Sequence, residues 1–132
     1  MNCKLLLIDD DVLPTDYYFY ALKERGFDVM QCEEADTAQD KWRALNPALV
    51  ILDVMMPPGK VVRAEDTKEG LHSGVLLFER LRRDLPDVPV IILTHLLSAP
   101  ELFSTENGVR VLLKSHVPPI ELADIVQQIL SN

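Results

Sequence analysis

The chain has 132 residues, of which 48% are hydrophobic and 26% charged, and these proportions are typical of one globular domain. The 21 acidic against 13 basic side chains give a formal net charge of −8, which disfavours direct binding to a nucleic-acid backbone. No apolar run approaches the roughly 20 residues of a membrane-spanning helix, and Cys3 and Cys32 are too few for a disulfide framework. We therefore expect a single cytoplasmic domain, residues 1–132, with no direct contact to nucleic acid or membrane.

Short apolar runs alternate with helix-like stretches along the chain. The runs are rich in Leu, Ile and Val and too short for core helices, which predicts strands buried on both faces. These strands are predicted at 5–8, 27–30, 48–52, 88–93 and 109–113. Helices are predicted at 14–25, 36–46, 73–85, 99–107 and 119–130. The alternation predicts an α/β fold with a five-stranded parallel sheet covered by helices on both faces.

The first predicted helix contains four consecutive aromatic residues, at 17–20. A helix cannot bury four consecutive side chains on one face, so some of them must be exposed to water. We expect Tyr18 or Phe19 to pack inward. The others would either border the core or form a docking surface for a partner protein.

The segment 57–72, PPGKVVRAEDTKEGLH, interrupts the alternation because it is polar and has no sustained period. It is much longer than the usual connection between a strand and a helix, which predicts an inserted loop. Two interpretations stay open. The loop is either a solvated insertion or a lid or docking element beside a functional edge.

Acids, a hydroxyl and an amine directly follow four of the five apolar runs: Asp9, Asp10, Asp11, Asp53, Thr94 and Lys114. In parallel α/β sheets, ligands bind beyond the carboxyl ends of the strands, so these side chains should meet at one edge. Clustered carboxylates repel each other unless a hard divalent cation such as Mg²⁺ neutralises them. Asp53 could then act as a nucleophile, with Thr94 and Lys114 around the oxygens of a transferring phosphoryl group. The predicted product is an aspartyl phosphate on Asp53.

These motifs together resemble the receiver domain of two-component response regulators, the chemotaxis-regulator-like domains. LLLIDDD (5–11) resembles the first strand and acid pair of the family, and LVILDVMMP (49–57) resembles its phosphoacceptor strand. VIILT (90–94) and VLLK (111–114) resemble the strands that carry its switch hydroxyl and lysine. The resemblance covers the chain apart from the 57–72 loop. It implies a flavodoxin-like three-layer sandwich with strand order 2-1-3-4-5.

The resemblance also implies a ligand set and partners. Asp10 would bind Mg²⁺ directly and Asp9 largely through water, while Asp53 and the backbone carbonyl of Met55 would complete the protein ligands. The phosphoryl donor would be a histidine kinase or a phosphotransfer protein. Because no output domain follows Leu130, the signal would pass to an unidentified downstream protein, with homodimerisation as a further option. No enzymatic activity is implied beyond self-phosphorylation and autodephosphorylation.

Several positions depart from the family pattern. Ser115 stands where a proline normally follows the lysine, and Val111 occupies the position of the usual switch Tyr or Phe. His95 replaces the small residue that normally follows the switch hydroxyl, and the 57–72 loop is an addition. We expect the chemistry to be kept without an aromatic switch. Output would then pass through the 57–72 loop and the face formed by Val111 and the last helix.

Two other functions stay open at this point. The departures at Val111 and Ser115 would suit a pseudo-receiver, an interaction module that keeps the fold without being phosphorylated. A haloacid-dehalogenase-like phosphatase would use two acids separated by one residue after its first strand, as here. That enzyme also needs an acidic pair after the lysine strand, where only Glu121 and Asp124 follow, inside a predicted amphipathic helix.

Overall fold

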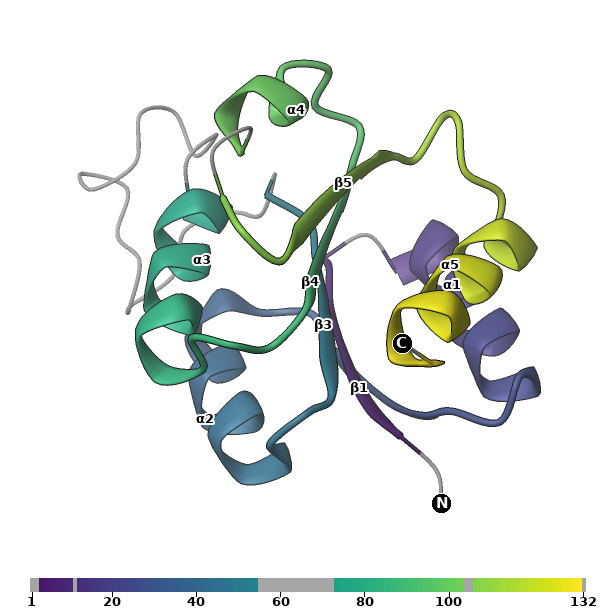
Figure 1. The fold of residues 1–132 in the computed structure, drawn as a ribbon, viewed down its shortest axis with the longest axis horizontal. Coiled ribbons are helices and arrows are strands. Elements are labelled where there is room, and N and C mark those ends of the chain that lie inside the picture. The colour runs from purple at the N-terminus through teal and green to yellow at the C-terminus, as the bar shows by residue number, and fades with distance from the viewer. Residues whose placement is uncertain (1–2, 11, 55–72, 104–105, 132) are drawn as a thin grey trace.

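The computed structural model describes residues 3–10, 12–54, 73–103 and 106–131 (Figure 1). Strands and helices alternate as predicted. Their bounds are β1 (Lys4–Ile8), α1 (Val12–Glu24), β2 (Asp28–Cys32), α2 (Ala35–Leu45), β3 (Leu49–Leu52), α3 (Ser73–Asp84), β4 (Val90–Thr94), α4 (Ala99–Leu102), β5 (Val109–Leu113) and α5 (Pro119–Ser131). Within the described residues, no helix is long and apolar enough to cross a membrane.

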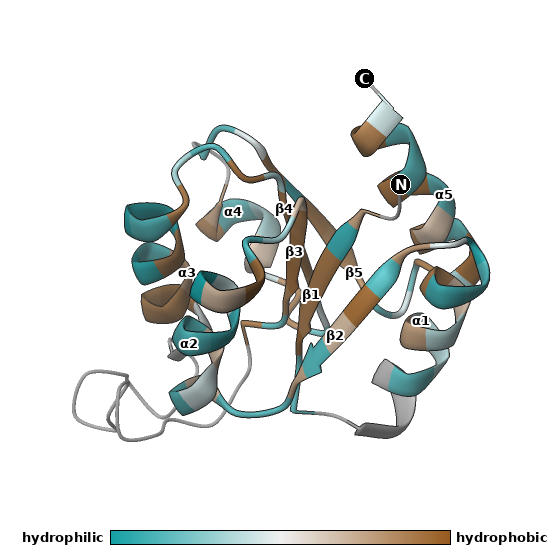
Figure 2. Cartoon of the chain, turned by 90° about the horizontal axis from the view of Figure 1, so that it is seen from below, coloured by the Kyte–Doolittle hydropathy of each residue, from teal (hydrophilic) through white to brown (hydrophobic). Residues whose placement is uncertain are grey.

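The five strands form one parallel sheet in the order β2-β1-β3-β4-β5, which confirms the order expected from the resemblance. Helices α2 and α3 cover one face of the sheet, and α1 and α5 cover the other (Figure 1). The sheet is the hydrophobic middle layer of this three-layer sandwich (Figure 2). All five strands run the same way, so their carboxyl ends reach the same edge of the sheet.

Alternation along the strands divides the core into two clusters. Side chains of one parity pack against α2 and α3: Leu6, Ile8, Val50, Leu52 and Ile92. Side chains of the other parity pack against α1 and α5: Leu5, Leu7, Leu49, Ile51, Ile91 and Leu93. Burial on both faces explains why the strands read as continuous apolar runs.

Several boundaries differ from the sequence prediction, all but the end of α4 by no more than two residues. Strand β2 begins at Asp28 because the end of α1 uses the backbone of the preceding residues: Gly26 N–H donates to Lys23 O and Phe27 N–H to Leu22 O. This is a Schellman-type ending, with Gly26 at φ 101°. Strand β2 extends to Cys32, which pairs with Ile8. Helix α4 is also shorter than the predicted 99–107, since it ends at Leu102.

Candidate functional site

Two of the predicted acids lie at the ends of neighbouring central strands. Asp9 follows β1 and Asp53 follows β3, and both residues continue the sheet by backbone hydrogen bonds. Asp9 N–H donates to Cys32 O and Asp53 N–H donates to Ile8 O, each with an N to O distance of 2.9 Å. Both side chains lie largely out of solvent, with the residues 2% and 5% exposed. The main chain at this edge is therefore fixed by the sheet.

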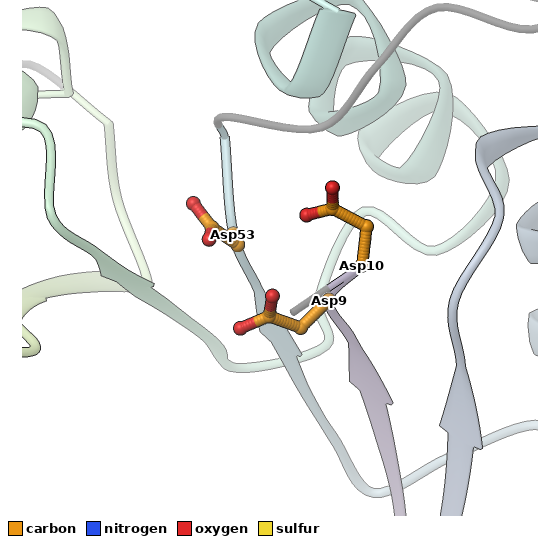
Figure 3. A group of neighbouring side chains, drawn as sticks. All are labelled: Asp9, Asp10 and Asp53. Atoms are coloured by element: carbon orange, nitrogen blue, oxygen red, sulfur yellow. The ribbon is translucent and has the colours of Figure 1, made fainter. Parts of the chain in front are cut away.

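Asp10 completes a cluster of carboxylates with Asp9 and Asp53 (Figure 3). One carboxylate oxygen from each residue lies within 4.8 Å of the other two, and Asp10 is exposed while its two neighbours are buried. Three carboxylate oxygens gathered at this spacing fit a hard divalent cation, which prefers oxygen ligands. The site thus suits Mg²⁺ by its donor chemistry. Met55, the fourth expected ligand, lies outside the described residues.

Lys114, at the end of β5, brings positive charge to the cluster. Its Nζ lies 2.7 Å from Oδ2 of Asp9 and 3.0 Å from Oδ2 of Asp53, and its side chain is 2% exposed. Burial alone would lower the pKa of this amine. The hydrogen bond to Asp9 and the charge of Asp53 outweigh burial, so the pKa of Lys114 is raised and the group stays an ammonium ion.

Thr94, the last residue of β4, is fully buried at the same edge. Its hydroxyl oxygen accepts a hydrogen bond from Leu96 N–H at 3.2 Å. Its carbonyl oxygen accepts one from Lys114 N–H at 2.9 Å, which ties the ends of β4 and β5 together. The hydroxyl, the amine and the acids therefore come from four strands that end side by side.

Gly74 braces the chain just after Asp53. Its N–H donates to Val54 O at 3.2 Å, and a Cβ at this position would lie 2.2 Å from Val54 Cα. Only glycine allows the start of α3 to approach the backbone so closely. Val54 and Gly74 are consequently held together. The 57–72 loop itself lies outside the described residues, so both interpretations of it stay predictions.

None of the remaining sequence candidates that the structure describes belongs to the group of three carboxylates or to its ion pairs with Lys114. Tyr17 and Tyr20 are 72% and 62% exposed, whereas Tyr18 is 6% exposed, as the limit on burying consecutive helical residues predicts. His95, Ser115 and His116 are exposed, and His72 lies outside the described residues. Val111 is half-buried and packs against the core cluster below α2 and α3.

The acidic pair that the phosphatase interpretation needs is on the surface. Glu121 and Asp124 are both exposed on α5. Asp124 Oδ1 forms an ion pair with Arg25 Nη1 at 2.7 Å. These contacts give α5 a role in packing against α1 and do not favour the phosphatase interpretation.

Sequence reasoning missed one contact beside the site. The hydroxyl of Tyr18 donates a hydrogen bond to Val117 O at 2.6 Å, with Lys114 O at 3.4 Å. The sequence indicated that an aromatic residue packs inward, and a buried tyrosine hydroxyl needs an acceptor. The identity of that acceptor depends on how α1 packs against the end of β5, which no local pattern encodes.

The model of the response regulator receiver domain family matches residues 5–126 of this chain. The chain belongs to that family. It is 35% identical over 95 residues to the DNA-binding dual master transcriptional regulator RpaA of Synechocystis, covering 70% of this chain and 34% of that protein. It is 38% identical over 93 residues to the transcriptional regulatory protein CpxR homolog of Haemophilus influenzae, covering 69% and 34%. This receiver domain thus spans about a third of the length of these relatives.

Solved structures agree on the fold. A CheY-like receiver domain protein from Methanospirillum hungatei superposes with a TM-score of 0.79 at 21% identity, covering 99% of this chain and 95% of that one. The BeF3-activated receiver domain of DrrB gives 0.75 at 22% identity, with both chains fully covered. At these identities the likeness establishes the flavodoxin-like fold.

Proposed function

We propose that this receiver domain accepts a phosphoryl group on Asp53 from a histidine kinase or a phosphotransfer protein. The observation that carries the proposal is the position of the Lys114 ammonium, 2.7 Å from Asp9 and 3.0 Å from Asp53, inside a cluster of three carboxylates. A buried ion pair that only supports the fold needs one acid. Here three acids and one amine converge where the strands end. This arrangement suits a phosphoryl group, which brings further negative charge and binds together with a divalent cation.

The transfer uses the carboxylate of Asp53 as nucleophile. One of its oxygens bonds to phosphorus while the bond from phosphorus to the donor imidazole nitrogen breaks, and the imidazole keeps that electron pair and takes a proton from solvent. The product is an acyl phosphate. Lys114 Nζ, already 3.0 Å from Asp53, pairs with one phosphoryl oxygen, and the Thr94 hydroxyl donates to another.

Asp9, Asp10 and Asp53 would hold Mg²⁺. When bound, this ion supplies positive charge that neutralises the carboxylates and the phosphoryl oxygens. The backbone carbonyl of Met55 would be a fourth ligand, as the family resemblance implies. The ammonium of Lys114, which contacts Asp9 and Asp53, would add further positive charge beside the phosphoryl group.

The exposed rings of Tyr17 and Tyr20 on α1 offer a docking surface for the phosphoryl donor, because the helix begins two residues after Asp10. The downstream partner is a second protein or a second copy of this chain. Relatives named as transcriptional regulators favour a partner that acts on transcription, while the net charge of −8 keeps direct DNA contact out of the proposal.

We further propose that residues 1–132 form one domain in the cytoplasm, where the free thiols of Cys3 and Cys32 stay reduced. Its activity is limited to its own phosphorylation and dephosphorylation. Val111, half-buried and aliphatic at the position of the family's switch aromatic, favours one other candidate, the pseudo-receiver. Such a module would leave Asp53 unmodified.

Intact-mass measurement after incubation with Mg²⁺ and acetyl phosphate distinguishes these functions. We expect wild type to gain one labile phosphoryl group and Asp53→Asn to gain none while staying folded. Asp84→Asn, the same isosteric change at a carboxylate between α2 and α3, is the matched control and should be labelled like wild type. Stoichiometric labelling of Asp53→Asn would refute the assignment of the acceptor, and an unlabelled wild type would favour the pseudo-receiver.

A further inference from the structure

The hydroxyl of Tyr18 connects α1 to the turn that carries Lys114. The oxygen lies 2.6 Å from Val117 O and 3.4 Å from Lys114 O, and the tyrosine is 6% exposed. A phenol has one proton to donate, and the shorter distance assigns it to Val117. Burial and the nearby charge of Asp9 raise the pKa of Tyr18 against the opposing effect of Lys114, so the hydroxyl stays a donor.

The turn at 114–117 has few other fixed points. At its start, Lys114 N–H donates to Thr94 O at 2.9 Å, the last bond that joins this segment to the sheet. His116 N–H then closes the turn on Leu113 O at 2.9 Å. Ser115 and His116 are exposed, and a serine has no ring that restricts φ as a proline would. The next buried residue is Val117, whose carbonyl is the one that Tyr18 holds.

We propose that Tyr18 is a positioning residue for the phosphoryl-transfer site, acting through Lys114. The inference rests on the proposed function of that site. Lys114 Nζ satisfies two acceptors at once, at 2.7 Å and 3.0 Å, with its side chain 2% exposed. Two simultaneous contacts and close packing around it restrict the rotamers of this side chain, so a shift of its backbone strains or lengthens these contacts. Tyr18 prevents that shift by fixing the far end of the turn.

Packing of the aromatic ring alone does not explain the geometry. The ring lies in the core cluster beneath α1 and α5 together with Val117, and phenylalanine would fill the same space. The hydroxyl adds a directional bond to the segment that carries the amine. Donor and acceptor are 99 residues apart in sequence, so this bond joins the first helix to the turn that follows the last strand.

The first test compares Tyr18→Phe with Ser131→Ala and Thr37→Val. All three variants lose one hydroxyl that donates to a backbone carbonyl, but the control hydroxyls belong to exposed residues on α5 and α2. We expect the rate constant of labelling by acetyl phosphate to fall about 10- to 100-fold in Tyr18→Phe, because small displacements of a positioned group cost rate on this scale. The controls should stay within about twofold of wild type. Equal rates for Tyr18→Phe and wild type would overturn the proposal.

A double-mutant cycle separates action through Lys114 from a general structural effect. In a Lys114→Met background the amine is gone, so adding Tyr18→Phe should leave the residual labelling rate unchanged. If the two substitutions instead multiply their effects on the rate, Tyr18 acts on some other feature and the proposal is wrong.

A spectroscopic measurement keeps this inference distinguishable from the proposed function. In ¹⁵N-lysine-labelled protein without Mg²⁺ at fixed pH, the enclosed Lys114 ammonium should give a protected signal. We expect Tyr18→Phe to shift that signal or broaden it by solvent exchange, while Ser131→Ala leaves it in place. If wild type is not phosphorylated but the signal responds in this way, the proposed function fails and the role of Tyr18 stands. A signal that is identical in Tyr18→Phe and wild type would overturn the positioning role.

Discussion

Two acidic sites in this molecule, one of three carboxylates and one of a single carboxylate, are stabilised in different ways. At the carboxyl edge of the sheet, one carboxylate oxygen from each of three acids lies within 4.8 Å of the other two, and two of these acids, Asp9 and Asp53, contact the ammonium of Lys114. Between α2 and α3, one carboxylate, that of Asp84, accepts hydrogen bonds from several donors on α2: Trp42 Nε1 at 2.8 Å, Arg43 Nε at 2.9 Å and Gln39 Nε2 at 3.2 Å.

The number of carboxylates gathered at one place distinguishes the edge of the sheet from the contact between α2 and α3. Bonds from Arg43, Trp42 and Gln39 lower the pKa of Asp84 to about 2, so this carboxylate stays ionised and joins the two helices. Asp9, Asp10 and Asp53 gather three carboxylates beside Lys114, and carboxylates this close repel one another, which a bound cation would relieve. We infer that the contacts of Asp84 serve the fold and that the cluster at the edge of the sheet serves chemistry.

The largest effect should come from Lys114→Met. Its ammonium contacts two largely buried carboxylates, and removing one partner of a buried ion pair leaves uncompensated charge, which costs about 3–5 kcal/mol. We expect the free energy of unfolding in urea with a chelator present to fall by about that amount. The matched control is Arg43→Met, since Arg43 is 58% exposed and Trp42 still donates to Asp84. Equal losses in the two variants would break the comparison between the clusters.

Magnesium should have an intermediate effect, confined to the edge of the sheet. A cation that binds only the folded state relieves repulsion among Asp9, Asp10 and Asp53 and raises the melting midpoint. At millimolar Mg²⁺ we expect a rise of a few °C, since about 1 kcal/mol corresponds to about 4 °C in a domain of this size. Asp10→Ala should gain less, and Asp84→Asn should gain as much as wild type. An equal gain for Asp10→Ala and wild type would contradict the metal site.

The edge cluster could be predicted from the sequence because its geometry follows from the fold class. Once the apolar runs are assigned to parallel strands, the residues that follow them must meet at one edge. Asp9, Asp53 and Lys114 were therefore expected together, and the structure brings their side chains into contact. Their chemical roles, and that of Met55, stay predictions that the mutants above test.

The Asp84 cluster could not be predicted because its contacts depend on helix packing. Trp42 and Asp84 are 42 residues apart in sequence, and they meet only when α2 lies against α3. A buried tryptophan signals that its N–H needs an acceptor, but the sequence does not say which one. The same limit applies to Tyr18 with Val117 and to Gly74 with Val54, which bond across separate elements.

The smallest effect, the pH dependence due to Asp84, tests the structural half of the comparison. Its folded pKa of about 2 lies below the ordinary value of 3.8, so between these pH values the unfolded state binds more protons than the folded state. The stabilisation is thus fully present above about pH 4 and is lost as the pH falls toward 2.

Urea unfolding across this range should give wild type a higher free energy of unfolding than Asp84→Asn at pH 5. This difference should shrink as the pH falls to 2. Arg43→Met provides a graded control. The hydrogen bond from Arg43 is the largest cause of the lowered pKa, so its removal should return the Asp84 pKa toward 3.8 and flatten the pH dependence, while Trp42 and Gln39 keep part of it. A difference between wild type and Asp84→Asn that stays constant from pH 5 to 2 would mean that Asp84 acts by shape and not by charge. The helix-joining cluster would then no longer be the electrostatic opposite of the edge cluster.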